Sequence, residues 1–320
     1  MLVIQNGAMR LFRVLGIDVF LHWSWVLVAV IEIQMRTNTY TTQIWNIAEY
    51  LTLFAIVLMH EFGHALACRS VGGKAERIML WPLGGVAYVN PPPRAGALLW
   101  SITAGPLVNV VLAPATIAAY FLFGTAEDGA GRDLQHYLLS VAVINVGLLI
   151  FNLLPVYPLD GGQILRAILW YFVGRIRSLT IASTVGLLGG GVGIVLAAWL
   201  GDPWLVILAG FAALKSWNGL KAARAMSAVL ALPRYAGVRC PVCHEPPPIG
   251  LFWRCPCGAR IDAFEQQMVC PKCNQMLQQV ACPYCGEAGP PIPWYATQRE
   301  GQTYTWPSAS NRNDANPPPI

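Results

Sequence analysis

Long apolar stretches recur along the first 220 residues, and they constrain the fold more than any other feature of the sequence. A helix that crosses the hydrocarbon core of a bilayer needs about 20 predominantly apolar residues. Because lipid offers the backbone no hydrogen-bond partners, a stretch of that length is expected to be helical. The six predicted spans cover residues 17–33, 48–68, 97–123, 137–154, 179–200 and 204–220.

Composition points the same way and excludes an ordinary soluble domain. Hydrophobic residue types make up 55% of the 320 residues and charged types only 12%, whereas soluble domains carry about 25% charged residues. So few charges cannot cover the surface of a soluble protein of this length. The expected fold class is an all-α polytopic membrane protein, with about six transmembrane helices and a small soluble part.

Basic residues indicate how the predicted spans are oriented, because cytoplasmic loops carry an excess of Lys and Arg. With the N-terminus in the cytoplasm, the inner segments hold twelve basic residues and the outer segments hold two, Arg36 and Arg132. The sequence therefore predicts a multi-pass protein of the cell membrane whose two termini are cytoplasmic. The inner residues are Arg10, Arg13, Arg69, Lys74, Arg77, Arg94, Arg166, Arg175, Arg177, Lys215, Lys221 and Arg224.

The segment between the second and third predicted spans is apolar but too short to cross a membrane. Residues 78–87 are rich in apolar types, yet Pro82, Gly84 and Gly85 interrupt them. Non-helical backbone at membrane depth is tolerated only where protein satisfies its hydrogen bonds. We therefore expect residues 72–94 to form a re-entrant or membrane-skimming hairpin.

Two histidines and a glutamate lie inside the second predicted span, where ionisable side chains are costly and usually functional. His60 and His64 are four residues apart, so on a helix they differ by about 40° in direction and about 6 Å in height. Both imidazoles can then share a zinc ion, and Glu61 is placed to accept a proton from a water that zinc activates. The alternative is a hydrogen-bonded polar cluster that joins neighbouring helices.

Asp160 is the candidate third ligand, because a catalytic zinc ion has three protein ligands and one open position. It follows the fourth predicted span after two prolines and precedes a Gly-Gly pair. These residues break the helix, and the broken backbone can turn the aspartate back toward the histidines. In the alternative interpretation, Asp160 is an interfacial turn residue or the N-cap of a helix over residues 163–172.

Two motifs together resemble the site-2 protease family of intramembrane zinc metalloproteases. The first is H-E-x-x-H at residues 60–64, and the second is N-x-x-P-x-x-x-x-D-G at residues 152–161. Residues 16–24, 82–87 and 104–109 resemble further segments of that family. The likeness covers approximately residues 10–225, and we find neither a PDZ nor a CBS domain, which the family often carries.

The resemblance implies both a set of site residues and an activity. It implies that His60, His64 and Asp160 bind one catalytic zinc ion, that Glu61 is the general base, and that Asn152 lies near the scissile carbonyl. The implied activity is hydrolysis of peptide bonds in transmembrane or membrane-proximal segments of a membrane-protein substrate. Two alternatives remain, a catalytically silent membrane scaffold and a membrane-anchored regulator that acts through its C-terminal part.

The hairpin over residues 72–94 has two interpretations that the sequence does not separate. A substrate helix must unwind before its peptide bond is reachable, because a helical carbonyl is already hydrogen-bonded and shielded. Residues 81–87 are a candidate for holding the unwound strand by edge pairing. The other interpretation is a linker that skims the membrane.

Eight of the nine cysteines form four closely spaced pairs in the C-terminal part. Eight thiolates can form two closed structural zinc sites of four ligands each, and disulfides are disfavoured in a reducing cytoplasm. We expect sequential grouping of the pairs, the first with the second and the third with the fourth, while a cross-braced arrangement stays open. The pairs are Cys240 with Cys243, Cys255 with Cys257, Cys270 with Cys273, and Cys282 with Cys285.

Three parts of the chain follow from these patterns. Residues 1–230 are the predicted intramembrane metalloprotease domain, 238–288 the double zinc ribbon, and 289–320 a Pro- and Asn-rich disordered tail. Basic residues are sparse in the ribbon, so binding to nucleic acid is not compelled. A cytoplasmic protein partner or substrate docking is the preferred role of the ribbon.

Overall fold

The computed structural model describes residues 4–5, 7–35, 39–81, 84–123, 129–286 and 288–294. The chain divides into two compact units, Met1–Lys221 and Ala222–Ile320. The division falls inside the last long helix rather than at a linker.

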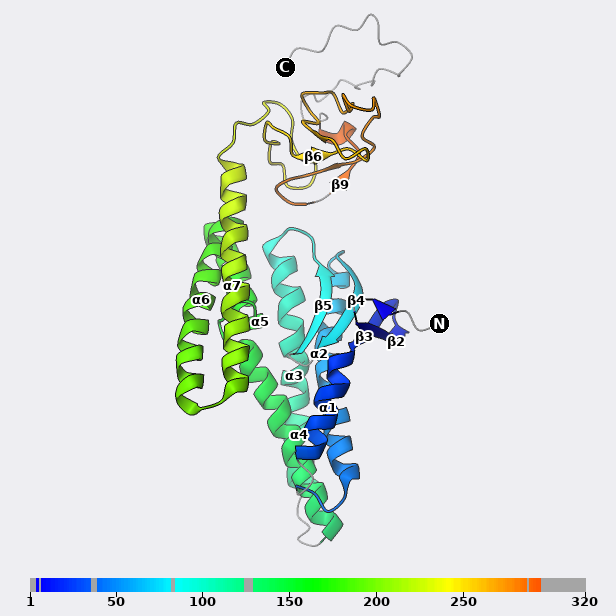
Figure 1. Cartoon of the computed structure of the whole chain (residues 1–320), viewed down its shortest axis with the longest axis vertical. Coiled ribbons are helices and arrows are strands. Elements are labelled where there is room, and N and C mark those ends of the chain that lie inside the picture. Colours follow the sequence, from blue (N-terminus) through cyan, green and yellow to red (C-terminus); the bar gives the residue numbers. More distant parts are fainter. Residues whose placement is uncertain are drawn as a thin grey trace, which may run out of the picture. The chain divides into compact units, whose positions relative to one another are not determined.

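A five-stranded sheet forms one end of the first unit (Figure 1). Its strands occur in chain order, and every neighbouring pair is antiparallel except β3 and β4, which are parallel because two helices connect them. Leu15 and Gly16 join β2 to β3 with φ of 50° and 73°, the geometry of a tight hairpin turn. The strands are β1 (Ile4–Gln5), β2 (Ala8–Val14), β3 (Ile17–His22), β4 (Lys74–Trp81) and β5 (Gly84–Asn90).

Long helices make up the rest of the first unit. The helices α2, α3 and α4 contact one another, α3 also contacts α5, and the upper part of α3 lies beside β5 in Figure 1. The helices are α1 (Trp23–Met35), α2 (Gln43–Ser70), α3 (Ala95–Phe123), α4 (Gly129–Leu153), α5 (Asp160–Val173), α6 (Arg175–Leu200) and α7 (Pro203–Leu230).

The sheet is attached to α2 by an apolar core. Ile17 and Val19 of β3 and Ile78 and Leu80 of β4 are all fully buried, because alternate residues of a strand point to the same face. They pack in one cluster with the C-terminal half of α2, including Cys68. This packing fixes β4 and β5 beside the part of α2 that carries the histidines.

Four helices are long and apolar enough to cross a membrane: Gln43–Ser70, Ala95–Phe123, Gly131–Leu153 and Arg175–Leu200. They match the second to fifth predicted spans. Their flanks expose large apolar side chains such as Val111, 71% exposed, and Trp199, 82% exposed. A long apolar helix with apolar side chains outward fits lipid better than water.

The first predicted span is wrong as a continuous helix, and with it the all-α class. Residues 17–22 are strand β3, and the helix that follows, α1, has 13 residues, which at about 1.5 Å each fall short of a bilayer core of about 30 Å. A short apolar run in the sequence is typical of a buried strand and of a buried helix alike, so the pattern does not distinguish them. The hairpin expected over residues 72–94 is confirmed as the antiparallel pair β4–β5.

The second unit has a small core of its own. Trp253, Phe264 and Trp294 pack together with the cysteines in one cluster, and two short strand pairs, β6 (Trp253–Arg254) with β7 (Arg260–Ile261) and β8 (Val280–Ala281) with β9 (Ala288–Gly289), lie among them. Trp294, in the 3-10 turn Ile292–Trp294, is 1% exposed. The ribbon therefore extends past its predicted end at residue 288, and residues 295–320 of the predicted tail lie outside the described residues.

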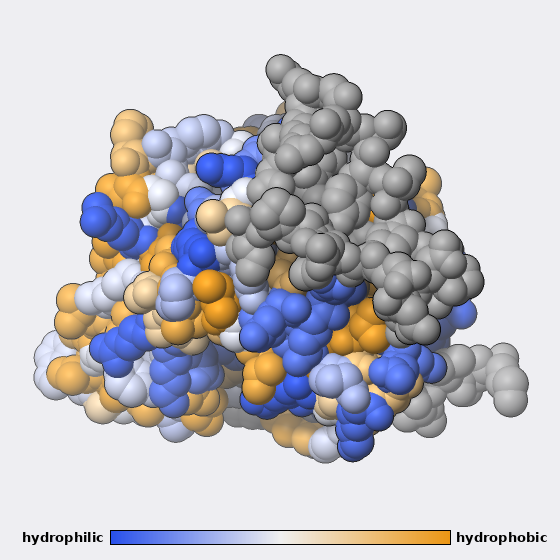
Figure 2. All heavy atoms as spheres, turned by 90° about the horizontal axis from the view of Figure 1, so that it is seen from above, coloured by the Kyte–Doolittle hydropathy of each residue, from blue (hydrophilic) through white to orange (hydrophobic). Residues whose placement is uncertain are grey.

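Hydrophilic and hydrophobic residues are interspersed over the end-on face drawn in Figure 2. This mixture contrasts with the exposed apolar flanks of the four long helices.

Candidate active site and metal centres

The centre of the first unit is a polar cluster on α2. His60, Glu61 and His64 are 5%, 6% and 5% exposed, although they belong to a helix long and apolar enough to span a membrane. The backbone of α3 covers the two imidazoles at Gly105, where a Cβ would lie 2.8 Å from His60 Nε2 and closer still to the His64 ring. Only glycine leaves room for both rings there.

Asp160, from the start of α5, meets the two histidines. Its Oδ2 lies 3.0 Å from His60 Nε2 and 3.3 Å from His64 Nε2, and the two Nε2 atoms are 3.1 Å apart. Ligand atoms about 2.0–2.2 Å from a tetrahedral zinc ion are separated from one another by about 3.3 Å. The three atoms thus form a triangle of the size that one zinc ion requires.

The outer nitrogens of both rings are held by acceptors on α3. His64 Nδ1 lies 2.9 Å from the Ser101 carbonyl oxygen, and His60 Nδ1 lies 2.6 Å from Asn109 Oδ1. Each ring therefore donates from Nδ1 and presents Nε2 to the triangle. Outer hydrogen bonds of this kind are what orient histidine ligands in metal sites.

Glu61, next to His60 on α2, contacts strand β5. Its Oε2 accepts a 2.7 Å hydrogen bond from the Ala87 backbone N–H. A Cβ at Gly85 would lie 2.6 Å from Glu61 Cδ, so the hairpin backbone passes directly over the carboxylate. The hairpin thereby contributes to the site through its main chain.

The loop that presents Asp160 is held by α6 and α7. The Ser216 hydroxyl donates a short hydrogen bond to the Tyr157 carbonyl, and a Cβ at Gly186 would lie 2.7 Å from the Tyr157 backbone nitrogen. Asp160 occupies the first turn of α5, and Leu159 is the N-cap. The alternative that Asp160 is the N-cap itself is therefore wrong.

Asn152, the remaining predicted site residue, lies in the last turn of α4 and is half-buried. It precedes the loop that leads to Asp160. The structure thus brings together His60, His64 and Asp160, with Glu61 beside them, and places Asn152 at the start of the same loop.

Sequence reasoning assigned no role to several residues of the site, although residues 104–109 resemble a segment of the site-2 protease family. Asn109, Ser101 and Gly105 belong to α3, and Asn145 of α4 contacts Asn109. The available signal was an asparagine within each of two predicted spans, since polar side chains in lipid need partners. The role of a backbone carbonyl, as at Ser101, leaves no trace in residue types.

The eight paired cysteines form two tetrads, and the expected sequential grouping is wrong. Cys240, Cys243, Cys282 and Cys285 form one, and Cys255, Cys257, Cys270 and Cys273 form the other. The second and third pairs are thus nested between the first and the fourth, and the second pair lies in the turn between β6 and β7. Sulfur separations of 3.5–3.7 Å across each tetrad suit a tetrahedral zinc ion with bonds of about 2.3 Å.

Thiol chemistry in the outer tetrad also suits a metal. The hydrogen bond from Cys243 lowers the pKa of the Cys282 thiol to about 5 and raises the pKa of Cys243 itself. Cys282 is then a thiolate at neutral pH, and the thiolate is the form that binds zinc. None of the nine cysteines is in a disulfide.

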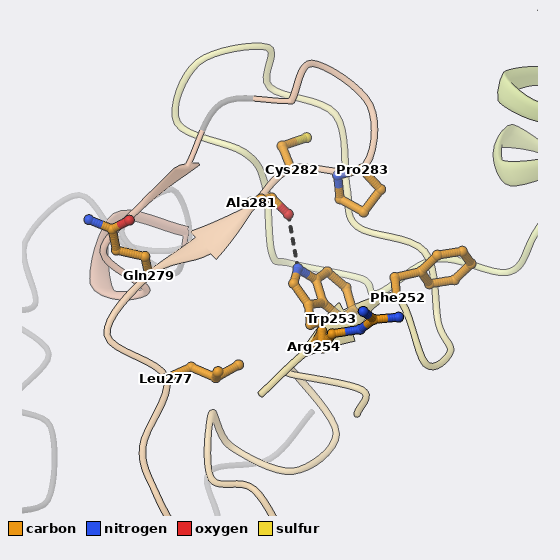
Figure 3. Close-up of a pocket in the computed structure, with 8 residues that line it drawn as sticks. All are labelled: Phe252, Trp253, Arg254, Leu277, Gln279, Ala281, Cys282 and Pro283. Atoms are coloured by element: carbon orange, nitrogen blue, oxygen red, sulfur yellow. Dashed lines mark hydrogen bonds between the residues drawn. The ribbon is translucent and has the colours of Figure 1, made fainter. Parts of the chain in front are cut away.

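A groove of about 250 Å³ lies on the ribbon beside the outer tetrad (Figure 3). Phe252, Arg254 and Leu277 are among its lining residues, and Trp253 Nε1 donates a 2.9 Å hydrogen bond to the Ala281 carbonyl at its wall. The lining includes neither a carboxylate nor an imidazole. This groove therefore lacks the groups for acid-base hydrolysis, which the triangle in the first unit has.

The first unit is similar to known proteins. The model of Peptidase family M50 matches residues 48–196, a range that contains the triangle and Glu61. A zinc metalloprotease of Methanocaldococcus jannaschii is 34% identical over 184 residues, which are 57% of this chain and 51% of that protein. Stage IV sporulation protein FB of Bacillus subtilis is 36% identical over 119 residues, 36% of this chain and 38% of that protein.

A solved structure agrees in fold. The site-2 protease from Methanocaldococcus jannaschii superposes with a TM-score of 0.50 and 28% sequence identity, and covers 67% of this chain and 95% of that one. The chain spans about half the length of the curated relatives it matches. The motifs, the family model and the shared fold agree that this part of the chain is similar to the site-2 protease family of zinc metalloproteases.

Proposed function

We propose that the protein is an intramembrane zinc endopeptidase that hydrolyses peptide bonds in transmembrane or membrane-proximal segments of other proteins. The observation that carries the proposal is the triangle of His60 Nε2, His64 Nε2 and Asp160 Oδ2, with sides of 3.0–3.3 Å, built on a candidate membrane helix. Two imidazoles and a carboxylate with an open fourth position are a ligand set of catalytic zinc.

Zinc, when bound, would lower the pKa of the attacking water toward about 7 and polarise the substrate carbonyl. The chain's residues do the rest of the chemistry. Glu61 accepts the proton of the attacking water and passes it to the leaving amine, a transfer that contributes about 10²–10⁴-fold to the rate. The Ala87 N–H, 2.7 Å from Glu61 Oε2, keeps that carboxylate in place while its other oxygen receives the proton.

Asn152 is the proposed donor to the developing oxyanion. It lies at the end of α4, eight positions before Asp160 in the loop that reaches the triangle. Its side-chain amide can donate to an oxygen that becomes negative, the kind of contact that lowers the barrier most.

The substrate strand is proposed to lie along the outer edge of β5, the edge not paired with β4. β5 is the last strand of the sheet order, and the Ala87 N–H points to Glu61 rather than to β4. Gly85 and Val89 share that outward direction, because backbone groups alternate along a strand. An unwound segment paired there would be held beside Glu61. The alternative role of residues 72–94, a linker that skims the membrane, does not explain why β5 contacts the carboxylate.

The proposed topology has six crossings, and the sheet enters the membrane from the cytoplasmic side. β3 with α1 would make the first crossing and α7 the sixth, in addition to the four helices of sufficient length and apolarity. The bias of twelve basic residues against two supports cytoplasmic termini and a cytoplasmic ribbon.

The two cysteine tetrads are proposed to bind one structural zinc ion each, which with the catalytic ion makes three per chain. So small a unit gains most of its stability from the metal. Its proposed role is to dock a substrate or a cytoplasmic protein partner, and the groove beside Trp253 is the surface available for it.

Two other functions are a silent membrane scaffold and a regulator that acts through the ribbon. A scaffold needs no carboxylate beside its metal, yet Glu61 is 6% exposed and held against β5. A regulator needs no zinc triangle in its anchor. Neither alternative accounts for the position of Glu61.

The test is to replace Glu61 by Gln and follow membrane proteins in cells that express the variant or the original chain. We expect a membrane protein to be cut by the original chain, and to stay intact and co-purify with Glu61→Gln. Glu49→Gln is the matched control, because Glu49 is also buried on α2 but lies twelve positions from Glu61. Equal cleavage by the Glu61→Gln protein would overturn the proposal.

A further inference from the structure

Two asparagines outside the triangle form a closed hydrogen-bonded loop behind His60. Asn109 of α3 and Asn145 of α4 are both 0% exposed. Asn109 Nδ2 donates to Asn145 Oδ1 at 2.8 Å, and Asn145 Nδ2 donates to the Asn109 backbone carbonyl at 3.0 Å. Asn109 Oδ1 then lies 2.6 Å from His60 Nδ1.

The direction of every hydrogen bond in this loop follows from one fixed acceptor. A backbone carbonyl only accepts, so the amide end of Asn145 must face it, and Asn145 Oδ1 is left facing Asn109. Asn109 must therefore turn its own amide group toward Asn145. Its Oδ1 is then the atom that faces His60, and His60 Nδ1 must carry the hydrogen.

We propose that Asn109 and Asn145 are positioning residues that fix the tautomer of His60, so that Nε2 faces Asp160 with a free lone pair. A neutral imidazole has one donor nitrogen and one acceptor nitrogen, and a hydrogen bond at one decides the other. The inference deepens the proposed function, and it rests on His60 being a metal ligand there.

The two histidines differ in how this orientation is secured. His64 Nδ1 donates to the Ser101 backbone carbonyl, which cannot turn round. His60 depends on a side-chain amide, which accepts in one orientation and donates in the other. Asn145 removes that ambiguity, and this explains why a second buried asparagine is present on α4.

An aspartate at position 109 separates orientation from packing. A carboxylate accepts through either oxygen, so Asn109→Asp still holds His60 in the required tautomer without help from Asn145. The cost of Asn145→Leu should therefore depend on the residue at 109. If Asn145 served only to join α3 to α4, its loss would cost the same in both backgrounds.

The experiment measures the zinc affinity of the full chain in detergent by competition with a chelator, and not activity. The reference is His60→Ala/His64→Ala, which retains only the zinc of the cysteine tetrads. Loss of an outer hydrogen bond to a ligand typically weakens metal binding by about 10–100-fold. We expect Asn145→Leu to weaken the third zinc by about that factor when residue 109 is Asn, and to change it little in the Asn109→Asp chain.

The control is Thr103→Val, which removes another side-chain hydrogen bond of α3, from Thr103 Oγ1 to the Leu99 carbonyl, and should leave affinity unchanged. Equal losses from Asn145→Leu in both backgrounds would overturn the inference, as would no loss in either. An original chain that binds no more zinc than the His60→Ala/His64→Ala reference would instead refute the proposed function. The two failures are therefore distinguishable.

Discussion

The Glu61 carboxylate lies so close to the β5 backbone that residue 85 has no room for a side chain. Glu61 is buried and accepts a hydrogen bond from Ala87, and a Cβ at Gly85 would collide with its carboxyl carbon at 2.6 Å. At the residue scale, the site thus depends on the lack of a side chain at Gly85 of β5 as well as on the residues of the triangle.

We predict that Gly85→Val displaces Glu61 and reduces cleavage by about 10²-fold or more, the contribution of a general base, while the membrane zinc is retained. Paired measurements of substrate cleavage and zinc content test this. Gly147→Ala is the control, since a Cβ there meets nothing within 4 Å. Undiminished cleavage by the Gly85→Val protein would show that the hairpin does not constrain the base.

The site residues that were predictable from the sequence are those with chemistry in their side chains and a local spacing. His60 and His64 share one helical face, Glu61 lies next to His60 in the chain, and Asp160 follows a helix break. Gly105 and Asn145 were not predictable as site residues, because their roles arise from contacts between helices far apart in the chain. A glycine in an apolar span is common and carries no signal of the ring that it accommodates.

At the scale of elements, α6 and α7 hold the loop that carries Asp160. Gly186 of α6 lies against Tyr157, and Ser216 of α7 donates to the carbonyl of the same residue. Residues 154–159 of this loop form neither a helix nor a strand. Packing of two helices outside the triangle thus fixes the position of Asp160.

We predict that Gly186→Ala shifts this loop and weakens the third zinc, since overpacking of this kind costs about 1–3 kcal/mol. Gly191→Ala, on the same helix but facing open space, should have no effect. Zinc affinity of the two variants measured side by side is the test. Equal affinities would mean that α6 does not position Asp160.

The nested tetrads give a prediction with opposite outcomes for the two groupings. Replacing Cys255 and Cys273 by Ser should release one zinc ion, because both belong to one tetrad, whereas sequential grouping would release two. Replacing Cys255 and Cys240 should release both ribbon ions. Zinc content of the purified variants decides between the groupings.

Helices were predictable from the sequence where an apolar stretch is too long to be a strand. The second to fifth predicted spans are confirmed as helices of sufficient length and apolarity. Residues 17–22 were misassigned, because their buried, continuous apolar pattern in β3 is shared by a helix and a strand. Which cysteine pairs share a tetrad depends on how the chain folds, and the spacing of the cysteines in the sequence does not determine this.

At the scale of the whole molecule, the chain joins a helical unit similar to the site-2 protease family to a cysteine-rich unit with its own core. We predict that a chain ending at residue 231 keeps one zinc ion and basal cleavage of its substrate. A truncated chain that has neither the zinc ion nor any cleavage would favour the regulator hypothesis, in which the membrane part is only an anchor.

The central claim is that His60, His64 and Asp160 hold a zinc ion within the membrane unit. Anomalous diffraction at the zinc edge, from crystals of the full chain, tests it most directly. The account predicts three peaks, one in each cysteine tetrad and one about 2.0–2.2 Å from His60 Nε2, His64 Nε2 and an Asp160 carboxylate oxygen. Peaks in the cysteine tetrads alone, from zinc-replete crystals, would contradict it.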